Sequence, residues 1–336
     1  MTDNAHTTPT DGVAPPPDVP FPHSRMNAHH VMNCVAPLAL LVACAQSATH
    51  GDAAPDVSVD AAAPDVAPVS VCPGVVAGPG LSCEVLGGPL VAPRDVWVTR
   101  DGAIYVTSMG AGTIVRLDGD RFVTVASGLQ APIGLREAPD GALIVGEEGA
   151  HSVARIDRTS GERTLIAGDL GNVTYLTIDP SGAVFASSFD RVGPFGTGRV
   201  TRLDPVTRAV ARYVTGLHVP EGLFVDAAGA LFVAEWSVPS SVRRYPPGGG
   251  EVGASSVVTA DLTNVYGLLS DGAGGMFIGD HAGRVLRQRA DGTREVVLDR
   301  IGRPGGFARE ADGALLVAEF VDFGAMGRLM RVRGLR

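Results

Sequence analysis

One short unit recurs along most of this chain, and it restricts the possible folds more than any other feature. The unit is a two-residue turn followed by an apolar strand, as in Asp101-Gly102-Ala-Ile-Tyr-Val and Asp140-Gly141-Ala-Leu-Ile-Val. It returns at Ser181-Gly182, Ala228-Gly229, Gly274-Gly275 and Asp312-Gly313, roughly every 42 residues. Asp-Gly and Ser-Gly turns supply positive φ at little steric cost, as tight hairpins require. The repeat therefore predicts a series of β-hairpins.

Further strands flank each turn. A short strand precedes it, and a third strand that alternates apolar residues with Arg follows it, as in Ile114-Val-Arg-Leu. A fourth strand follows in five repeats, for example at 122–126. Four strands in a repeat of this length are typical of a propeller blade. We therefore predict an all-β fold over 72–336: a six-bladed β-propeller with four strands per blade.

The two ends of the repeat region are complementary. The sixth repeat reaches Arg336 without a fourth strand, whereas the segment from Cys83 to Pro93 aligns with Val123 to Pro132. Residues 84–87 are therefore predicted to form the outer strand of the last blade. Such pairing would close the ring and cover its open edge.

The first 71 residues differ in composition. The apolar run from Val35 to Ala43 has the length of a signal-peptide core and is too short to span a bilayer. Its end, Leu41-Val42-Ala43-Cys44, resembles the lipobox of bacterial lipoproteins. The resemblance implies an N-terminal extension and signal peptide over 1–43 and a lipid on Cys44; a buried apolar segment with an incidental cysteine is the alternative. Residues 44–71, rich in Ala, Pro and Asp, predict a disordered tether.

The lipobox resemblance also predicts a location. The protein would be exported and held at the bacterial envelope by its lipid anchor alone. Ala45 and Gln46 lack the Asp that retains some lipoproteins at the inner membrane, which favours the outer membrane. In an oxidising compartment we expect a disulfide between Cys72 and Cys83, with two free thiols as the alternative.

Composition excludes some functions. The net charge of -9 argues against nucleic-acid binding, which uses a basic surface. The sequence has no nucleophile elbow, no phosphate-binding glycine loop that opens a helix and no Cys-x-x-Cys pair. We expect a monomer that binds a small molecule, a glycan or a protein on one propeller face.

The segment from Pro220 to Glu235, PEGLFVDAAGALFVAE, resembles repeats of the gluconolactonase/senescence-marker-protein superfamily. It is also similar to NHL-repeat and streptogramin-lyase propellers, and the resemblance extends over 84–336. The resemblance to lactonase-type members implies a divalent metal in the central channel. Its ligands would be a Glu that opens the first inner strand and an Asn and an Asp that open later ones. Here the first inner strand opens with Pro93-Arg94-Asp95, without a Glu. The corresponding later positions are Ile133, Thr174, Glu221, Tyr266 and Gly305.

Candidate binding residues gather on one face, where inner strands begin and second strands end. The candidates are Asp95, Tyr175, Glu221, Trp236, Tyr266, Asp280 and His281. Glu221 and Asp95 are the candidate ligands of a divalent cation, calcium or zinc, because hard cations take carboxylate oxygens. An acid recurs at the end of the second strand, at Glu147, Glu235, Asp280 and Glu319. That repetition favours a structural role, in which the acid binds backbone or an Arg of a neighbouring blade.

Three functions remain open. The first is an envelope lipoprotein whose propeller binds a ligand or partner without catalysis. The second is a metal-dependent lactonase or hydrolase with a rearranged site of Glu221, Asp95 and Asp280. The third is a lyase like the streptogramin lyases, although His218 and His281 do not reproduce the spacing of a His pair there.

Overall fold

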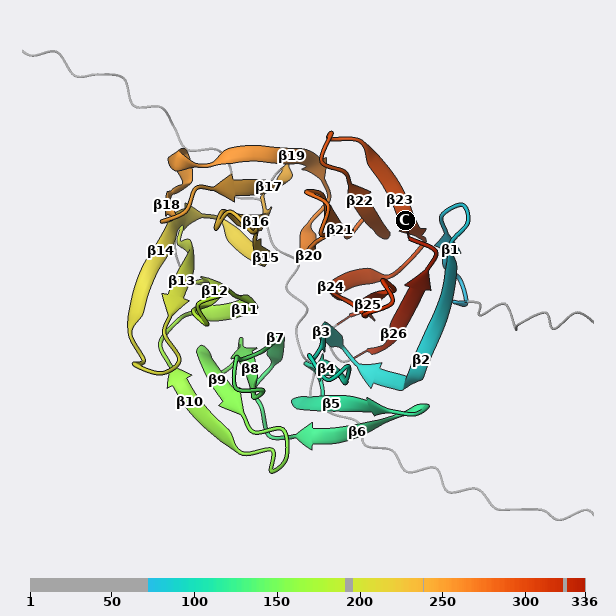
Figure 1. The fold of residues 1–336 in the computed structure, drawn as a ribbon, viewed down its shortest axis with the longest axis horizontal. Helices are drawn as coiled ribbons and strands as arrows, with labels where there is room; N and C mark the ends of the chain where they lie inside the picture. Colours follow the sequence, from blue (N-terminus) through green and yellow to red (C-terminus); the bar gives the residue numbers. More distant parts are fainter. Residues whose placement is uncertain (1–71, 191–195, 238, 323–324, 336) are drawn as a thin grey trace, which may run out of the picture. The chain divides into compact units, whose positions relative to one another are not determined.

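The repeat folds into six sheets arranged around a central axis. The structure is a computed structural model and describes residues 72–336, apart from 191–195, 238, 323–324 and 336. The described residues form β-strands and one short 3₁₀ turn, η1 (Val252–Ala254). The prediction of an all-β, six-bladed propeller is confirmed (Figure 1).

Each blade of the first half runs outward from the axis in chain order. Blade 1 contains β3 (Pro93–Val98), β4 (Ile104–Ser108), β5 (Thr113–Asp118) and β6 (Arg121–Ala126). Blade 2 contains β7 (Pro132–Glu137), β8 (Leu143–Glu147), β9 (Ser152–Ile156) and β10 (Arg163–Ala167). Blade 3 contains β11 (Asn172–Ile178), β12 (Val184–Phe189), β13 (Gly198–Leu203), β14 (Val210–Leu217) and a fifth strand, β18 (Gly250–Glu251).

The second half continues this order and adds strands from the N-terminal side. Blade 4 contains β15 (Val219–Val225), β16 (Leu231–Trp236), β17 (Ser240–Tyr245) and β19 (Ser256–Leu262). Blade 5 contains β20 (Val265–Ser270), β21 (Met276–Asp280), β22 (Arg284–Gln288), β23 (Arg294–Asp299) and β1 (Val76–Ala77). Blade 6 contains β24 (Arg303–Arg309), β25 (Leu315–Phe320), β26 (Met326–Arg333) and β2 (Ser82–Val91). Blades 3 and 5 therefore have five strands, where four were predicted.

The ring closes through the inner strands and through β2. The six inner strands β3, β7, β11, β15, β20 and β24 contact one another in succession, and β24 also contacts β3. β2 pairs antiparallel with β26, with Glu84 opposite Arg331 and Leu86 opposite Leu329. This pairing agrees with the closing strand expected at 84–87, and β2 extends it to ten residues.

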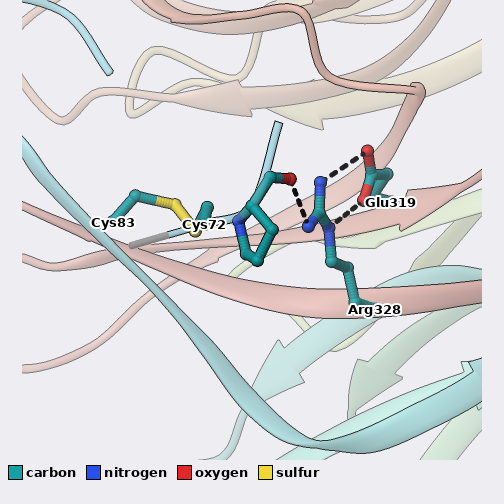
Figure 2. Close-up of a disulfide and its surroundings, with 5 residues drawn as sticks. Cys72, Cys83, Glu319 and Arg328 are labelled. Atoms are coloured by element: carbon teal, nitrogen blue, oxygen red, sulfur yellow. Dashed lines mark hydrogen bonds and ion pairs between the residues drawn. A yellow bond between two sulfur atoms is a disulfide. The ribbon is translucent and has the colours of Figure 1, made fainter. Parts of the chain in front are cut away.

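A disulfide lies beside this closing strand. Cys72 and Cys83 are bonded, with their Cα atoms 5.5 Å apart, as the sequence predicted. Figure 2 shows that Arg328 of β26 is bonded both to the start of the disulfide loop and to Glu319. Its Nη1 donates a hydrogen bond to the carbonyl of Pro73 at 2.9 Å, and its Nε donates to the carboxylate of Glu319. The loop is therefore fixed to the blade by a covalent bond and by a hydrogen bond from Arg328.

The hydrophobic core consists of layers between successive blades. Between blades 6 and 1, for example, Leu316 and Leu329 pack with Val96 and Val106. Small residues let the inner strands approach closely: a Cβ on Gly222 would lie 2.4 Å from the carbonyl oxygen of Tyr266 in the next blade. Close packing of this kind makes the inner strands a rigid frame for the side chains at the axis.

The predicted N-terminal features lie outside the described residues. These are the signal peptide over 1–43, the lipidation site Cys44 and the tether over 44–71. Within the described part of the chain, no helix is long and apolar enough to cross a membrane.

Candidate functional site

Each inner strand has an irregularity near its start, and these irregularities determine which side chains reach the axis. Regular pairing is interrupted between Pro93 and Val96 in blade 1 and between Pro220 and Leu223 in blade 4. The other four inner strands show the same interruption. The first residues inside it are Arg94, Ile133, Thr174, Glu221, Tyr266 and Gly305, one from each blade. The strand starts also pair with the ends of the second strands, so both lie on one face, as predicted.

Arg94 is the cation of this site. Its side chain is buried, and the centre of its guanidinium lies 4.9 Å from the ring centroid of Tyr266 and 4.3 Å from that of Phe320. Burial opposes its charge, but Tyr175, Glu221, Tyr266 and Glu148 favour it, so the pKa of Arg94 is raised. Aromatic faces attract a guanidinium and hold its plane in place. Arg94 therefore stays charged, and its Nε has no hydrogen-bond partner.

Glu221 enters the site from blade 4, opposite blade 1 in the ring. It is 3% exposed, and its Oε2 has no hydrogen-bond partner. Burial raises the pKa of Glu221 to about 8, against the lowering effect of Arg94. A carboxyl with this pKa is largely protonated at neutral pH, so it can donate as well as accept a hydrogen bond.

Four aromatic side chains from blades 4, 5 and 6 form one wall. Tyr266 and His281 are stacked, with ring centroids 3.8 Å apart, and Trp236 lies 6.1 Å from Tyr266. Phe320 meets both stacked rings edge-on. Burial, with Arg94 and Arg303, lowers the pKa of His281 to about 3, so the imidazole is neutral. Its Nε2 is buried without a partner.

Tyr175 forms the inner side of the site. Its ring is buried, and its hydroxyl donates a hydrogen bond across the axis to the carbonyl oxygen of Arg94 at 3.3 Å. Burial raises the pKa of Tyr175, so the phenol keeps its proton. Burial likewise raises the pKa of Tyr266 to about 12. These two phenols contribute no charge to the site at neutral pH.

Asp95 has a different position from the one expected. Its Oδ2 accepts hydrogen bonds from the backbone N–H of Leu135 at 2.9 Å and from Arg136 Nη1 at 2.7 Å, and its Oδ1 accepts from Val96. A Cβ on Gly306 would lie only 1.8 Å from Oδ1. We therefore assign Asp95 to the junction of blades 6, 1 and 2 and leave it out of the site.

Asp280 also belongs to the framework. It accepts from the backbone N–H of Thr263 and Ala282 and from Arg284 at 2.5 Å. The other recurrent acids repeat the pattern: Glu147 binds Gln130 N–H and Arg163, Glu235 binds His218 N–H and Arg243, and Glu319 binds Gly302 N–H and Arg328. Each acid ties the entry of its own inner strand to an Arg of the same blade, on β10 for Glu147 and on the third strand for the other three, whereas an Arg of the neighbouring blade was expected. The structure thus supports the framework role that the repetition favoured.

The residues at the axis do not fit the divalent cation that the resemblance implies. Arg94 occupies the strand position where a Glu ligand was expected, and its charge beside Glu221 repels another cation. Calcium needs six to eight oxygen ligands, and the oxygens of Asp95 are already bound to Arg136 and backbone. Within the described residues, no group of three or more His, Cys, Asp or Glu side chains is placed to hold a metal ion.

Two members of the site were not among the candidates from sequence. Arg94 is adjacent to the candidate Asp95. It stands where a Glu was expected, and that replacement was the one feature of the sequence that could have pointed to it. Phe320 follows the recurrent acid Glu319 and carried no signal, because apolar residues are common at strand ends. In contrast, Tyr175, Glu221, Trp236, Tyr266 and His281 were all candidates, and the structure brings them together.

No protein-family model and no curated protein sequence matches this chain. Many solved structures resemble it. A gluconolactonase from Xanthomonas campestris has a TM-score of 0.65 at 14% identity, over 75% of this chain and 89% of that one. The calcium-binding protein regucalcin from Agrobacterium tumefaciens has a TM-score of 0.60 at 18% identity, over 74% and 93%. Virginiamycin B lyase from Staphylococcus aureus has a TM-score of 0.52 at 14% identity, over 72% and 80%.

These neighbours have different activities, and their sequence identities to this chain are low. Likeness at this level shows a shared fold and leaves function to the residues of the site. The chain is a six-bladed β-propeller of the same fold as gluconolactonases, regucalcin and streptogramin lyases.

Proposed function

We propose that this propeller is a binding domain that takes a small organic molecule at the axis, on the face where the inner strands begin. The observation that carries the proposal is a group of three buried polar atoms without partners: Arg94 Nε, Glu221 Oε2 and His281 Nε2. They come from side chains beside one aromatic wall. Buried polar atoms in native proteins are nearly always hydrogen-bonded, so three unpartnered atoms in one place favour a bound partner.

The composition of the site supports a small molecule as that partner. Ligand sites combine many apolar and aromatic side chains with a few placed polar groups, and this site has that combination. Trp236 and His281 are its half-buried members, whereas Arg94 and Glu221 are almost completely buried. A ligand therefore approaches past Trp236 and His281 and contacts the charged groups last.

Tryptophan fluorescence tests the proposal directly. The chain has two tryptophans, and Trp97 lies at the other end of its inner strand, beside a hollow of about 580 Å³. In a Trp97→Phe background, Trp236 is the sole reporter. We expect at least one member of a panel of ring-bearing acids, amides, sugars and lactones to change its emission saturably and to raise the melting temperature.

Two variants show whether such binding occurs at the site. Tyr266→Leu removes the ring that joins His281, Trp236 and Arg94, and it should weaken binding roughly tenfold or more. Phe232→Leu disturbs a stacked aromatic pair with Phe224 elsewhere in blade 4 and should leave affinity unchanged. A panel without binders, or binding that survives in Tyr266→Leu, would contradict the proposal.

The lactonase alternative is tested with the same panel. The gluconolactonase fold and the position of Glu221 favour it, and the poor fit of the axis residues to a metal opposes it. Acid release from glucono-δ-lactone by the wild-type protein, lost in Glu221→Gln, would replace binding with hydrolysis as the function. We expect no release above the spontaneous rate.

We also propose that the domain is displayed at the bacterial envelope through a lipid on Cys44. The support is the Leu41–Cys44 sequence and the Ala/Pro/Asp-rich segment that follows it. Two or more acyl chains give stable anchoring. Expressed in bacteria, the chain should fractionate with membranes and carry the mass of the lipid, and Cys44→Ser should move it to the soluble fraction. Equal fractionation of both forms would rule out this anchor.

A further inference from the structure

We infer that the site at the axis recognises the carboxylate of a ring-bearing organic acid, and that the guanidinium of Arg94 supplies the positive charge that a metal would otherwise provide. This inference rests on the proposed function, since it names the class of ligand that the same site takes.

The position of the Arg94 guanidinium suits the binding of a planar anion. Tyr266 and Phe320 face its guanidinium at 4.9 and 4.3 Å from their ring centroids, and Tyr175 fixes its backbone carbonyl. Aromatic faces stabilise the charge but do not accept hydrogen bonds in the guanidinium plane. The unpartnered Nε–H therefore needs an acceptor in that plane, and a carboxylate matches a guanidinium edge.

Glu221 does not itself fulfil this role. The charges of Arg94 and Glu221 influence each other, yet Glu221 Oε2 and Arg94 Nε both remain without hydrogen-bond partners. A ligand carboxylate that contacts both residues can accept from Arg94 with one oxygen and from the protonated Glu221 carboxyl with the other. A single anionic group thus pairs both atoms.

The surrounding side chains complete the expected chemistry of the ligand. The stacked pair of Tyr266 and His281, with Trp236 beside it, offers flat apolar surface to a ring attached to the carboxylate. The His281 imidazole is neutral, and its Nε2 can pair with a polar substituent on that ring. Glu148 and Arg303 are further charged groups that act on the site, and they are of opposite sign.

Matched acids and neutral analogues test this class. The probes are benzoate against benzamide and D-glucuronate against D-glucose, with sodium chloride and inorganic phosphate as anions that have no ring, all titrated by Trp236 emission in the Trp97→Phe protein. At least one acid should bind roughly tenfold or more tighter than its neutral partner, because only the acid gains an ion pair with Arg94. EDTA should not change the affinity.

Substitutions at Arg94 and Glu221 separate charge from shape. Arg94→Gln should remove the preference for the acid, whereas Arg94→Lys, which keeps the charge but loses the planar edge, should keep part of it. Glu221→Gln retains a hydrogen-bond donor and should change acid affinity by less than roughly threefold. If Arg94→Gln fails to fold, the pair of Arg94→Lys and Glu221→Gln still decides the matter, since Lys must weaken acid binding more than Gln does.

The other outcomes overturn the inference in different ways. Neutral analogues that bind as tightly as the acids, with sensitivity to Tyr266→Leu, would leave the proposed function standing and reject carboxylate recognition. If phosphate or chloride binds as tightly as the acids, the site recognises anions in general and does not select a ring-bearing carboxylic acid. If EDTA abolishes acid binding, a metal ion and not Arg94 supplies the positive charge. If no probe binds, the proposed function fails as well.

Discussion

Asp95 and Arg136 form a buried ion pair across the junction of blades 1 and 2, with 2.7 Å between Asp95 Oδ2 and Arg136 Nη1. Arg136 also lies over the ring of Trp97, 4.8 Å from its centroid. Asp95 thus couples neighbouring inner strands at the residue next to Arg94.

Removal of this carboxylate should be costly. Asp95→Ala leaves Arg136 as a buried charge without its partner and leaves the N–H of Leu135 unpaired, so we expect about 3–5 kcal/mol of destabilisation. Urea unfolding of the variant and wild type measures it. Asp140→Ala is the matched control, because Asp140 pairs with Arg155 in solvent, and it should cost at most about 1 kcal/mol. Similar losses in both variants would show that Asp95 has no special role.

The adjacent residues Arg94 and Asp95 show where sequence reasoning ends. The turns and alternating strands predicted the blades, and the start of each inner strand supplied Glu221 and Tyr266 as candidates. Side chains alternate between faces along a regular strand, but a local irregularity breaks that rule between Pro93 and Val96. The sequence carries no mark of this irregularity, so the only signal for Arg94 over Asp95 was that it stands where a Glu was expected. Asp280 was both a binding candidate and one of the recurrent acids, and its bonds to backbone N–H groups and to Arg284 agree with the structural role that the recurrence favoured.

Stability should depend on pH through Glu221. The pKa of its carboxyl is about 8 in the folded protein and 4.5 is its ordinary value, so the folded state keeps a proton that the unfolded chain releases between these values. Stability should therefore fall as pH rises from about 4.5 to 8, by an amount on the order of a few kcal/mol. Glu221→Gln cannot titrate, and its unfolding free energy should be flatter over this window. A wild-type slope in the variant would count against the buried, protonated carboxyl.

His281 should produce the opposite dependence in acid. The pKa of its imidazole is lowered from 6.5 to about 3 by burial, Arg94 and Arg303, so the folded state resists protonation that the unfolded chain accepts. Stability should decline as pH falls from about 6.5 toward 3. In His281→Gln this acid-side decline should become smaller, as measured by thermal unfolding at a series of pH values. His151 is exposed, and His151→Gln should leave the decline unchanged.

The disulfide should stabilise the closing strand. Cys72 and Cys83 are 11 residues apart, and a loop of that size corresponds to about 3 kcal/mol in the chain-entropy account. Reduction of the wild type should lower the urea midpoint and accelerate hydrogen exchange in β2 and β26 before other blades. The Cys72→Ser/Cys83→Ser double variant should resemble the reduced protein and no longer respond to reductant. Uniform acceleration of exchange in all six blades would show that the disulfide does not stabilise the closing strand in particular.

A single substitution at Arg94 should test whether this residue is what keeps a metal out of the site. Arg94→Glu restores a carboxylate at the strand position where the lactonase-type resemblance expects one, facing Glu221 from the opposite blade, with Glu148 on the same face. Two or three carboxylates without a cation repel one another, so the variant should be less stable than wild type in EDTA. Calcium takes several carboxylate oxygens together with water, and it should recover much of that loss by binding the folded state. The wild type, whose guanidinium already supplies the charge, should show no change in melting temperature with calcium. Equal stabilisation of both proteins by calcium would mean that Arg94 does not exclude the ion. The claim that its guanidinium takes the place of a metal would then be wrong.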